Sequence, residues 1–273
     1  MSFHEVFTKG VLACCVLGLV AGLAGCSMAP QRSAPGDVKP HRGVAKARRM
    51  PVHGIDVSRY QGDIDWGRVR KAGTEFAYIK ATEGGDHIDE KFYQNWHGAR
   101  RAGVPRGAYH FMYWCRPAEE QADWFRKIVP QDPEALPPVL DLEWNHTSPS
   151  CPKGTTPENA LAMAKEILAA MEEHTGKRPI IYTDITFHDD VLKGELRDYP
   201  FWIRSVAAEP YLRYGDRRWT MWQYTTTGHV PGIDTTVDRN VFYGNRDQWQ
   251  AMLETHCDPR DIPHLSRIGL CVK

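Results

Sequence analysis

Residues 136–143 read Leu136-Pro137-Pro138-Val139-Leu140-Asp141-Leu142-Glu143, a short apolar run that is opened by prolines and closed by two acids. Prolines before a run of this length are typical of the first residues of a buried strand. Side chains at i and i+2 of a strand point to the same side, so Asp141 and Glu143 should share one face. An isolated Asp-x-Glu pattern is more often a strand end with solvated or ion-paired acids than a catalytic pair, so its surroundings must decide.

Strand-like runs alternate with helical stretches from Val52 onward. The predicted strands are 53–57, 76–80, 106–111, 139–142, 179–182, 201–204 and 219–223. A helix is predicted at 156–174, because Thr155-Thr156-Pro157-Glu158 is a capping-box pattern and Gly176 is a typical stop. Repeated βα units of this size indicate a parallel sheet, and about eight of them close into a barrel. We therefore predict an α/β fold, a TIM-like (β/α)-barrel that can be irregular with fewer than eight helices.

Acidic residues stand at the ends of these predicted strands. Asp56 ends the first, Glu83 follows the second, Asp141 and Glu143 end the fourth, and Asp184 follows the fifth. The carboxyl ends of barrel strands share one mouth, where active sites are built. Two neighbouring carboxylates push their pKa values apart, which leaves one proton donor and one anion, the combination that glycoside hydrolysis needs. The convergence favours the catalytic interpretation.

The N-terminus has the features of a targeting segment. Lys9 precedes an apolar stretch at 11–24 that is too short for a comfortable membrane span and ends in Leu23-Ala24-Gly25-Cys26, which resembles a bacterial lipobox. We therefore expect a lipoprotein signal peptide at 1–25 and a lipidated Cys26. The alternative is an ordinary secretory signal in which Cys26 is incidental.

Residues 26–51 are predicted to be the lipidated cysteine and a flexible basic tether. Prolines, glycines and cations dominate there, and large apolar side chains are almost absent. Ser27, directly after the cysteine, weakly resembles the pattern that directs lipoproteins to an outer membrane. We expect an exported protein that is anchored through Cys26 to a bacterial membrane, in the first place the outer membrane facing the periplasm.

Cysteine usage supports export. Beyond Cys26, four cysteines remain, and an even number in an exported domain favours two disulfides. Among three pairings we prefer Cys115–Cys151 and Cys257–Cys271, because the last two share a short C-terminal tail at 251–273. The chain has no C-x-x-C pair and no H-E-x-x-H motif, so we expect no metal and no cofactor. Lys and Arg total 34, as do Asp and Glu, so no global charge points to nucleic acid. We expect a monomer.

Six blocks within residues 52–250 resemble, in the same order, glycoside hydrolase family 25, the muramidases or lysozymes of the Chalaropsis type. The first three are His53-Gly54-Ile55-Asp56-Val57-Ser58 with Tyr60-Gln61-Gly62, Phe76-Ala77-Tyr78-Ile79-Lys80-Ala81-Thr82-Glu83-Gly84, and Arg106-Gly107-Ala108-Tyr109-His110-Phe111. The others are Asp141-Leu142-Glu143, Pro179-Ile180-Ile181-Tyr182-Thr183, and Trp222-Gln223-Tyr224 with Gly228, Val230-Pro231-Gly232 and Val237-Asp238-Arg239-Asn240-Val241-Phe242. The resemblance implies one catalytic barrel at 52–250.

The resemblance carries the family's catalytic acids onto Asp56, Asp141, Glu143 and Asp238. Glu143 is then expected to be the general acid, and an anionic Asp141 would orient the 2-acetamido group of the substrate, which makes hydrolysis substrate-assisted and retaining. Alternatively, a carboxylate activates water for inversion. Asp56 and Asp238 would hold charge or hydroxyls at the cleavage subsite, unless they are mouth acids bonded to the backbone or to a neighbouring cation.

The pKa of Glu143 is expected to be raised by the crowding of Asp141 and by an apolar wall of Trp144 and Tyr78. The expected substrate-binding residues are Tyr60, Tyr78, Glu83, Phe111, Tyr182, Trp222 and Tyr224. Each aromatic residue among them is equally suited to core packing. His110 is interpreted as a satisfied strand histidine rather than a general base.

The implied activity is hydrolysis of the β-1,4 bond between N-acetylmuramic acid and N-acetylglucosamine, with peptidoglycan glycan strands as the partner. Two alternatives stay open: a non-catalytic glycan-binding lipoprotein, and a hydrolase of another N-acetylglucosamine-containing glycan. One position departs from the family. After the tryptophan of the sixth strand the family commonly has a small residue, whereas Phe201-Trp202-Ile203-Arg204-Ser205-Val206 places an arginine at the mouth. This departure leaves substrate length and tolerance for peptide stems open.

Overall fold

The computed structural model describes residues 36–37, 39, 41–145, 148–152 and 154–255. These residues belong to one compact unit, Ser33–Lys273. The predicted signal peptide, the lipidated Cys26 and the predicted Cys257–Cys271 pair lie outside the described residues. In the described part of the chain, no helix is long and apolar enough to cross a membrane.

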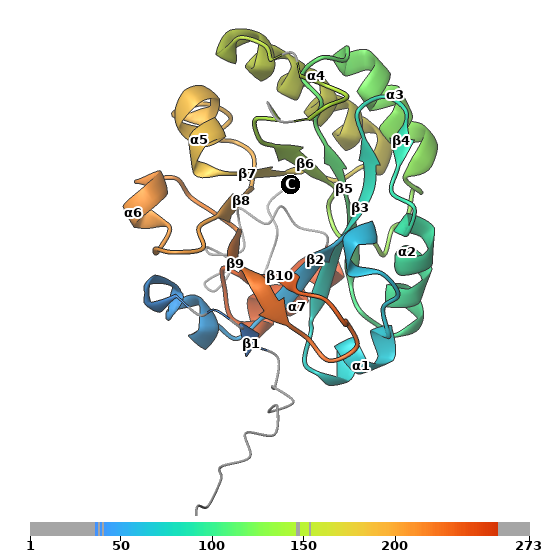
Figure 1. Ribbon diagram of the computed structural model, residues 1–273, viewed down its shortest axis with the longest axis vertical. Helices are drawn as coiled ribbons and strands as arrows, with labels where there is room; N and C mark the ends of the chain where they lie inside the picture. Colours follow the sequence, from blue (N-terminus) through green and yellow to red (C-terminus); the bar gives the residue numbers. More distant parts are fainter. Residues whose placement is uncertain (1–35, 38, 40, 146–147, 153, 256–273) are drawn as a thin grey trace, which may run out of the picture. The chain divides into compact units, whose positions relative to one another are not determined.

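Eight strands close into a barrel (Figure 1). Six of them run parallel as successive neighbours: β2 (His53–Val57), β3 (Phe76–Glu83), β5 (Arg106–Phe111), β6 (Val139–Leu142), β7 (Ile180–Thr183) and β8 (Phe201–Arg204). β9 (Met221–His229) runs parallel to β8, whereas β10 (Val237–Phe242) closes the ring antiparallel to both β9 and β2. The mouth therefore collects the C-terminal ends of seven strands and the N-terminal end of β10. The predicted barrel fold is confirmed.

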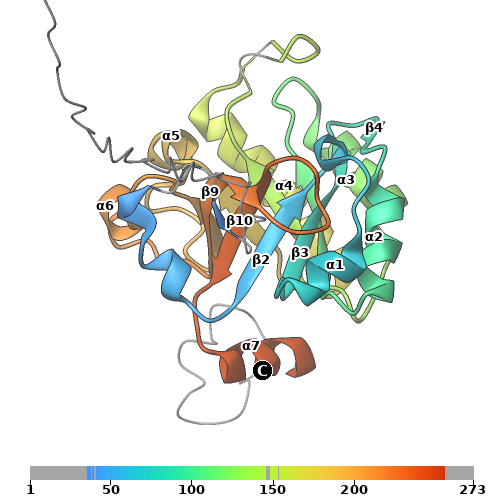
Figure 2. The ribbon, with the colours of Figure 1, turned by 60° about the horizontal axis from the view of Figure 1, so that its bottom comes forward.

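Two short strands pair antiparallel at the margins, β1 (Gly36–Asp37) with β9 and β4 (His87–Ile88) with β3. Helices cover the outside of the ring (Figure 1): α1 (Trp66–Lys71), α2 (Phe92–Arg101), α3 (Ala118–Ile128), α4 (Pro157–Thr175), α5 (Ile185–Phe187) continuing into a π-helix at His188–Leu192, and α6 (Tyr211–Tyr214). α7 (Arg246–Thr255) lies below the barrel in Figure 2. The described connection from β9 to β10 contains no helix, so the barrel is irregular.

Local sequence explains most element boundaries. β2, β5, β6 and β8 have the predicted bounds. β3 runs on to Glu83, β7 lies one residue later than predicted, and β9 begins at Met221 rather than at 219 and runs on to His229. The predicted long helix is confirmed as α4: the Thr156 side chain caps its start by accepting from the Asn159 amide at 3.3 Å, and Gly176 ends it at φ 67°. β10 is absent from the predicted strands, because Asp238 and Asn240 interrupt the apolar pattern.

Both predicted boundaries of the catalytic barrel move outward. Short 3-10 helices at Arg42–Val44 and Ala47–Arg49 bury Val44 and Ala47 completely, so the second half of the predicted tether packs on the barrel domain. At the other end, α7 crosses the predicted boundary at 250 and buries Trp249 and Met252. In both segments a few apolar side chains suffice to attach a stretch whose overall composition is polar.

The interior of the barrel is filled from below. Tyr78 is wholly buried and lies across Gly107, where a Cβ atom would come within 2.2 Å of the ring. Its ring centroid is 5.0 Å from that of Trp202, and Trp249 of α7 packs against Phe76 at 5.1 Å. Among the described residues these side chains fill the lower part of the barrel, and the open cavity lies at the end where the C-termini of the parallel strands meet.

Candidate active site

The four predicted catalytic acids line one cavity of about 120 Å³ at the mouth of the barrel. Asp56 lies in β2 and Asp141 in β6, Glu143 is the first residue after β6, and Asp238 lies at the start of β10. Because β10 is antiparallel, its early residue Asp238 lies in register with Asp56, near the end of β2. The remaining lining residues are Tyr109, Val139, Tyr182, Trp202 and Gln223.

Asp56 and Asp238 form the first pair of acids, and two amide side chains hold them. Gln223 Nε2 donates to Asp56 Oδ1 and to Asp238 Oδ2, each at 3.1 Å. Asn240 Nδ2 donates to Asp56 Oδ1 at 2.7 Å. These amides are oriented in turn, since Gln223 Oε1 accepts from the Tyr182 hydroxyl at 2.9 Å and Asn240 Oδ1 accepts from Trp202 Nε1 at 2.8 Å.

Burial dominates the electrostatics of this first pair. It raises the pKa of Asp56, against the effect of the hydrogen bonds from Asn240 and Gln223. Burial, with the neighbouring charge of Asp56, raises the pKa of Asp238 to about 8. The pair therefore holds at least one proton at neutral pH.

Asp141 and Glu143 form the second pair, and it is held differently. Asp141 is only 8% exposed, yet its Oδ1 has no hydrogen-bond partner among the described residues. Burial, then the charge of Glu143, raises the pKa of Asp141 well above its usual value. Burial, then the charge of Asp184, raises the pKa of Glu143, while Arg204 opposes the rise. A buried acceptor left unpaired is costly, so the cavity is suited to a ligand that donates a hydrogen bond there.

The two residues predicted to form an apolar wall around Glu143, Tyr78 and Trp144, do not line the cavity. Tyr78 lies below the cavity, with its hydroxyl donating to the Pro137 carbonyl at 3.2 Å. Trp144 packs against Phe187 at 4.7 Å and donates through Nε1 to Asp190 Oδ2. Neither lines the cavity, in which Tyr182 and Trp202 supply the aromatic surface instead.

Three of the expected sugar-binding aromatics are buried and offer no face to a substrate. Tyr78, Trp222 and Tyr224 are at most 1% exposed. The reason for the last two is strand alternation: they flank Gln223, and since Gln223 faces the cavity, they face the helix layer. Gln223 is the functional candidate that sequence reasoning missed, together with Asn240 on β10.

The other predicted binding residues lie nearer the surface. Tyr182 lines the cavity, and Tyr60 is 70% exposed in the short 3-10 helix Arg59–Gln61 that follows β2. Phe111 is half-buried, with the Lys80 ammonium 4.8 Å from its ring centroid. Glu83 is ion-paired to Lys80 and accepts from the Tyr113 hydroxyl. Although burial acts to raise the pKa of Glu83, Lys80 holds it below the usual value, so this carboxylate stays charged beside its cation.

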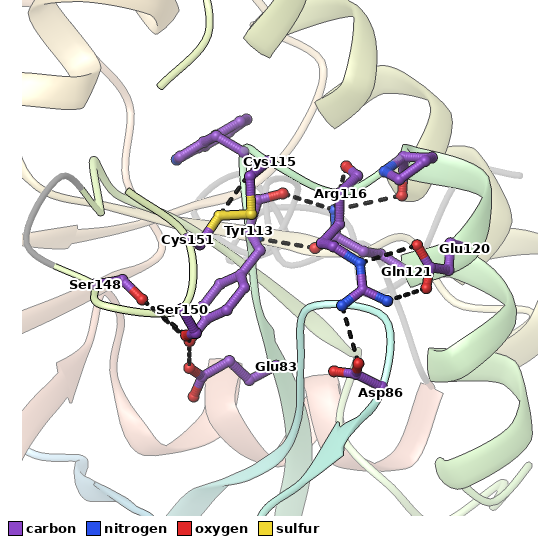
Figure 3. The surroundings of a disulfide bond; sticks show 12 residues. Glu83, Asp86, Tyr113, Cys115, Arg116, Glu120, Gln121, Ser148, Ser150 and Cys151 are labelled. Atoms are coloured by element: carbon purple, nitrogen blue, oxygen red, sulfur yellow. Dashed lines mark hydrogen bonds and ion pairs between the residues drawn. A yellow bond between two sulfur atoms is a disulfide. The ribbon is translucent and has the colours of Figure 1, made fainter. Parts of the chain in front are cut away.

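The Cys115–Cys151 disulfide is present, as predicted. It joins the segment after β5 to the segment after β6, with the two Cα atoms 5.6 Å apart. Figure 3 shows Tyr113 beside the disulfide, pointing toward Glu83, and the Tyr113 hydroxyl lies 3.3 Å from Ser150 Oγ. The disulfide and these hydrogen bonds tie together two loops that border the catalytic strand β6.

His110 has the structural role that was predicted for it. It is fully buried, with Nδ1 at 2.8 Å from Thr82 Oγ1 and Nε2 at 3.3 Å from Gln121 Oε1. Burial lowers its pKa to about 4, so it is neutral at physiological pH. In the part of the chain that the structure describes, no three His, Cys, Asp or Glu side chains are gathered to hold a metal ion.

The sequence pattern of glycosyl hydrolases family 25 matches residues 55–233. Lysozyme M1 of Streptomyces globisporus is 37% identical over 223 residues, which cover 77% of this chain and 74% of that protein. YegX of Escherichia coli (strain K12) is 37% identical over 218 residues, 74% of each chain. A family 25 glycosyl hydrolase structure from Bacillus anthracis superimposes with a TM-score of 0.71 at 35% identity, covering 78% of this chain and 97% of that one.

Proposed function

The chain belongs to glycosyl hydrolases family 25 and is a glycoside hydrolase, and we propose that it acts as an N-acetylmuramidase on peptidoglycan glycan strands. The observation that carries this proposal is the convergence of four carboxyl groups with raised pKa values on one cavity. Glycosidic bond cleavage needs one carboxyl that keeps its proton near neutral pH and another that bears charge. The raised pKa values supply the proton donor, and a hydrogen bond from the substrate to Asp141 would favour the charged form of that carboxyl.

Glu143 is the proposed general acid. Its carboxyl gives a proton to the glycosidic oxygen as the bond from C1 of the sugar to that oxygen breaks. The raised pKa supports this role, since the group must be protonated when the substrate binds. Once the leaving sugar has departed, the same carboxylate accepts a proton from the incoming water.

Asp141 is the proposed partner that orients the 2-acetamido group. The unpaired Oδ1 would accept the acetamido N–H, and this hydrogen bond favours the charged form of Asp141. The amide oxygen then attacks C1, and water later opens the cyclic intermediate, so the configuration at C1 is retained. Asp56 and Asp238, held by Gln223 and Asn240, would bind hydroxyls of the same sugar. NMR of the first-formed anomer distinguishes this course from inversion.

Anchoring and location are further parts of the proposal. The lipobox-like Leu23-Ala24-Gly25-Cys26 supports a lipid anchor at Cys26, and the basic residues after it would favour an anionic membrane surface. We place the enzyme as a monomer on the outer membrane, facing the periplasm. Fatty-acid labelling of the full chain and of Cys26→Ser tests this part, because the label should be lost in the variant.

Digestion of purified peptidoglycan tests the activity. Borohydride reduction of the products should convert N-acetylmuramic acid, and not N-acetylglucosamine, at the newly formed ends. Glu143→Gln should abolish this release, whereas Glu166→Gln, which changes an exposed glutamate of α4, should leave it intact. Release that is unchanged in Glu143→Gln contradicts the assigned acid, and reduced glucosamine ends contradict the assigned bond.

A further inference from the structure

Arg204 is a cation at the mouth of the barrel. It is the last residue of β8 and lies in register with Gln223 of β9, whose side chain faces the cavity. Along β8, Trp202 lines the cavity and Ile203 packs in the outer core, so alternation points Arg204 to the same side as Trp202. The Arg204 side chain therefore lies at the rim of the cavity, two residues further along β8 than Trp202 and on the same side of the strand.

The backbone that carries Arg204 is fixed. Its carbonyl oxygen accepts from the Tyr214 hydroxyl at 2.6 Å. The next amide, of Ser205, donates to the Gln223 carbonyl at 3.0 Å, and the Ser205 carbonyl accepts from Trp222 Nε1 at 2.8 Å. The fixed backbone sets the point from which the Arg204 side chain extends, so no backbone ordering is required when a ligand binds.

Within the described part of the chain, Arg204 has no ion-pair partner. Among the described residues, no salt bridge and no side-chain hydrogen bond involves its guanidinium, although the side chain is half-buried. Lys80, a cation that also lies near the mouth, is paired with Glu83. Arg204 still lies within electrostatic range of the site, since its charge lowers the pKa of Asp56, Glu143 and Asp238. A partly desolvated guanidinium that has no ion-pair partner is suited to bind an anionic group of a ligand.

We propose that Arg204 binds a carboxylate of the substrate and thereby selects glycans that bear one at the muramic acid residue. The proposal rests on the proposed muramidase function. Muramic acid differs from glucosamine by a lactyl ether with a carboxyl group, and the planar fork of arginine suits that group in a bidentate pair. The carboxylate comes either from the lactyl group itself, where the peptide stem has been removed, or from the stem.

Two pairs of substrates separate these sources. The first pair is glycan strands stripped of stems, before and after conversion of the lactyl carboxylate to its methylamide. The second pair is strands with stems, before and after the same treatment. Steady-state kinetics would be measured for the wild type, Arg204→Ala and Arg204→Lys, each at its own pH optimum. Arg213→Ala, which removes an exposed arginine of α6, is the matched control.

The wild type should prefer the untreated member of one pair by about tenfold or more, mostly through KM, and that pair identifies the source. Arg204→Ala should lose this preference, Arg204→Lys should keep part of it, and Arg213→Ala should keep all of it. An equal loss on treated and untreated strands in Arg204→Ala, or no preference in the wild type, overturns the proposal.

Binding of the same strands to the Glu143→Gln protein, measured by calorimetry, separates this proposal from the proposed function. If no strand is cleaved by the wild type, the muramidase assignment fails. A preference in binding that Arg204→Ala removes would still support the carboxylate subsite, and its absence would reject it.

Discussion

The two pairs of carboxyl groups in this cavity differ in what holds them. Asp56 and Asp238 are tied to Gln223 and Asn240, which are themselves fixed by Tyr182 and Trp202. Asp141, in contrast, keeps a buried oxygen without a partner next to Glu143. The protein thus holds Asp56 and Asp238 in place before a ligand binds, whereas the hydrogen bonding of Asp141 is completed by the ligand. This difference predicts that changes in the first pair act on stability and changes in the second on turnover.

The largest expected effect comes from the second pair. Glu143→Gln should lower kcat by a factor on the order of 10²–10⁴, the usual contribution of a general acid, because the amide cannot give a proton to the leaving oxygen. Its thermal stability should not fall, since a buried group that resists ionisation is replaced by a neutral one. Turnover of muropeptide strands and a melting curve measure the two quantities. A strongly destabilised Glu143→Gln protein would contradict the proposed difference between the two pairs of carboxyl groups.

The next effect concerns the ties of the first pair. Asn240→Ala should lower the free energy of unfolding by about 2–4 kcal/mol, because it leaves a cavity, leaves the buried Trp202 Nε1 without its acceptor and removes one of the two amide donors to Asp56 Oδ1. Asp141→Asn is the contrasting variant and should not destabilise the fold, since no protein donor is lost at Oδ1. Urea unfolding of both variants gives the comparison, and equal destabilisation would contradict it.

A pH dependence of stability follows from Asp238. Its pKa is about 8 in the folded chain against an ordinary value of 3.8, so between these values the folded state binds more protons than the unfolded state. Stability should therefore fall as pH rises from about 4 to about 8. Asp238→Asn should flatten this part of the curve, while Asp216→Asn, at an exposed position, should not. Urea midpoints across this pH range test the sign, and a rise in stability that depends on Asp238 would reject it.

The smallest effect is expected at the junction between the pairs. Tyr182→Phe removes the hydroxyl that donates to Gln223 Oε1. This change should lower the free energy of unfolding by about 1 kcal/mol. Gln223 keeps its bonds to both acids, so kcat/KM should fall less than about tenfold. A loss as large as that of Glu143→Gln would show that Tyr182 belongs to the catalytic group itself.

Sequence reasoning locates the acids well because strand ends can be read from local patterns. Asp56, Asp141 and Glu143 follow apolar runs that are buried in the barrel wall. Sequence reasoning fails where strand pairing around the whole barrel decides whether a side chain faces the cavity or the helices. Trp222 and Tyr224 are expected at the sugar, yet Gln223 between them faces the cavity. The register of β10, antiparallel and with a polar interior, cannot be read from its own residues because its partners β2 and β9 impose it.

Two segments are predicted wrongly because their average composition is polar although each contains a few buried apolar side chains. The polar stretch before Val52 looks like a tether, but Val44 and Ala47 are enough to dock its second half. The predicted tail begins inside α7, whose Trp249 packs beneath the barrel. In each segment two buried side chains, which an averaged composition hides, attach the chain to the barrel domain.

The antiparallel β10 makes the site a product of the whole chain. Asn240 reaches back to Asp56 across 184 residues of sequence, so the first and last barrel strands share one hydrogen-bonded cluster. A nascent or truncated chain that ends before Val237 contains Asp141, Glu143 and Gln223 but lacks Asp238 and Asn240, one of the two amides that hold Asp56. Assembly of the complete four-acid site therefore needs the chain as far as β10.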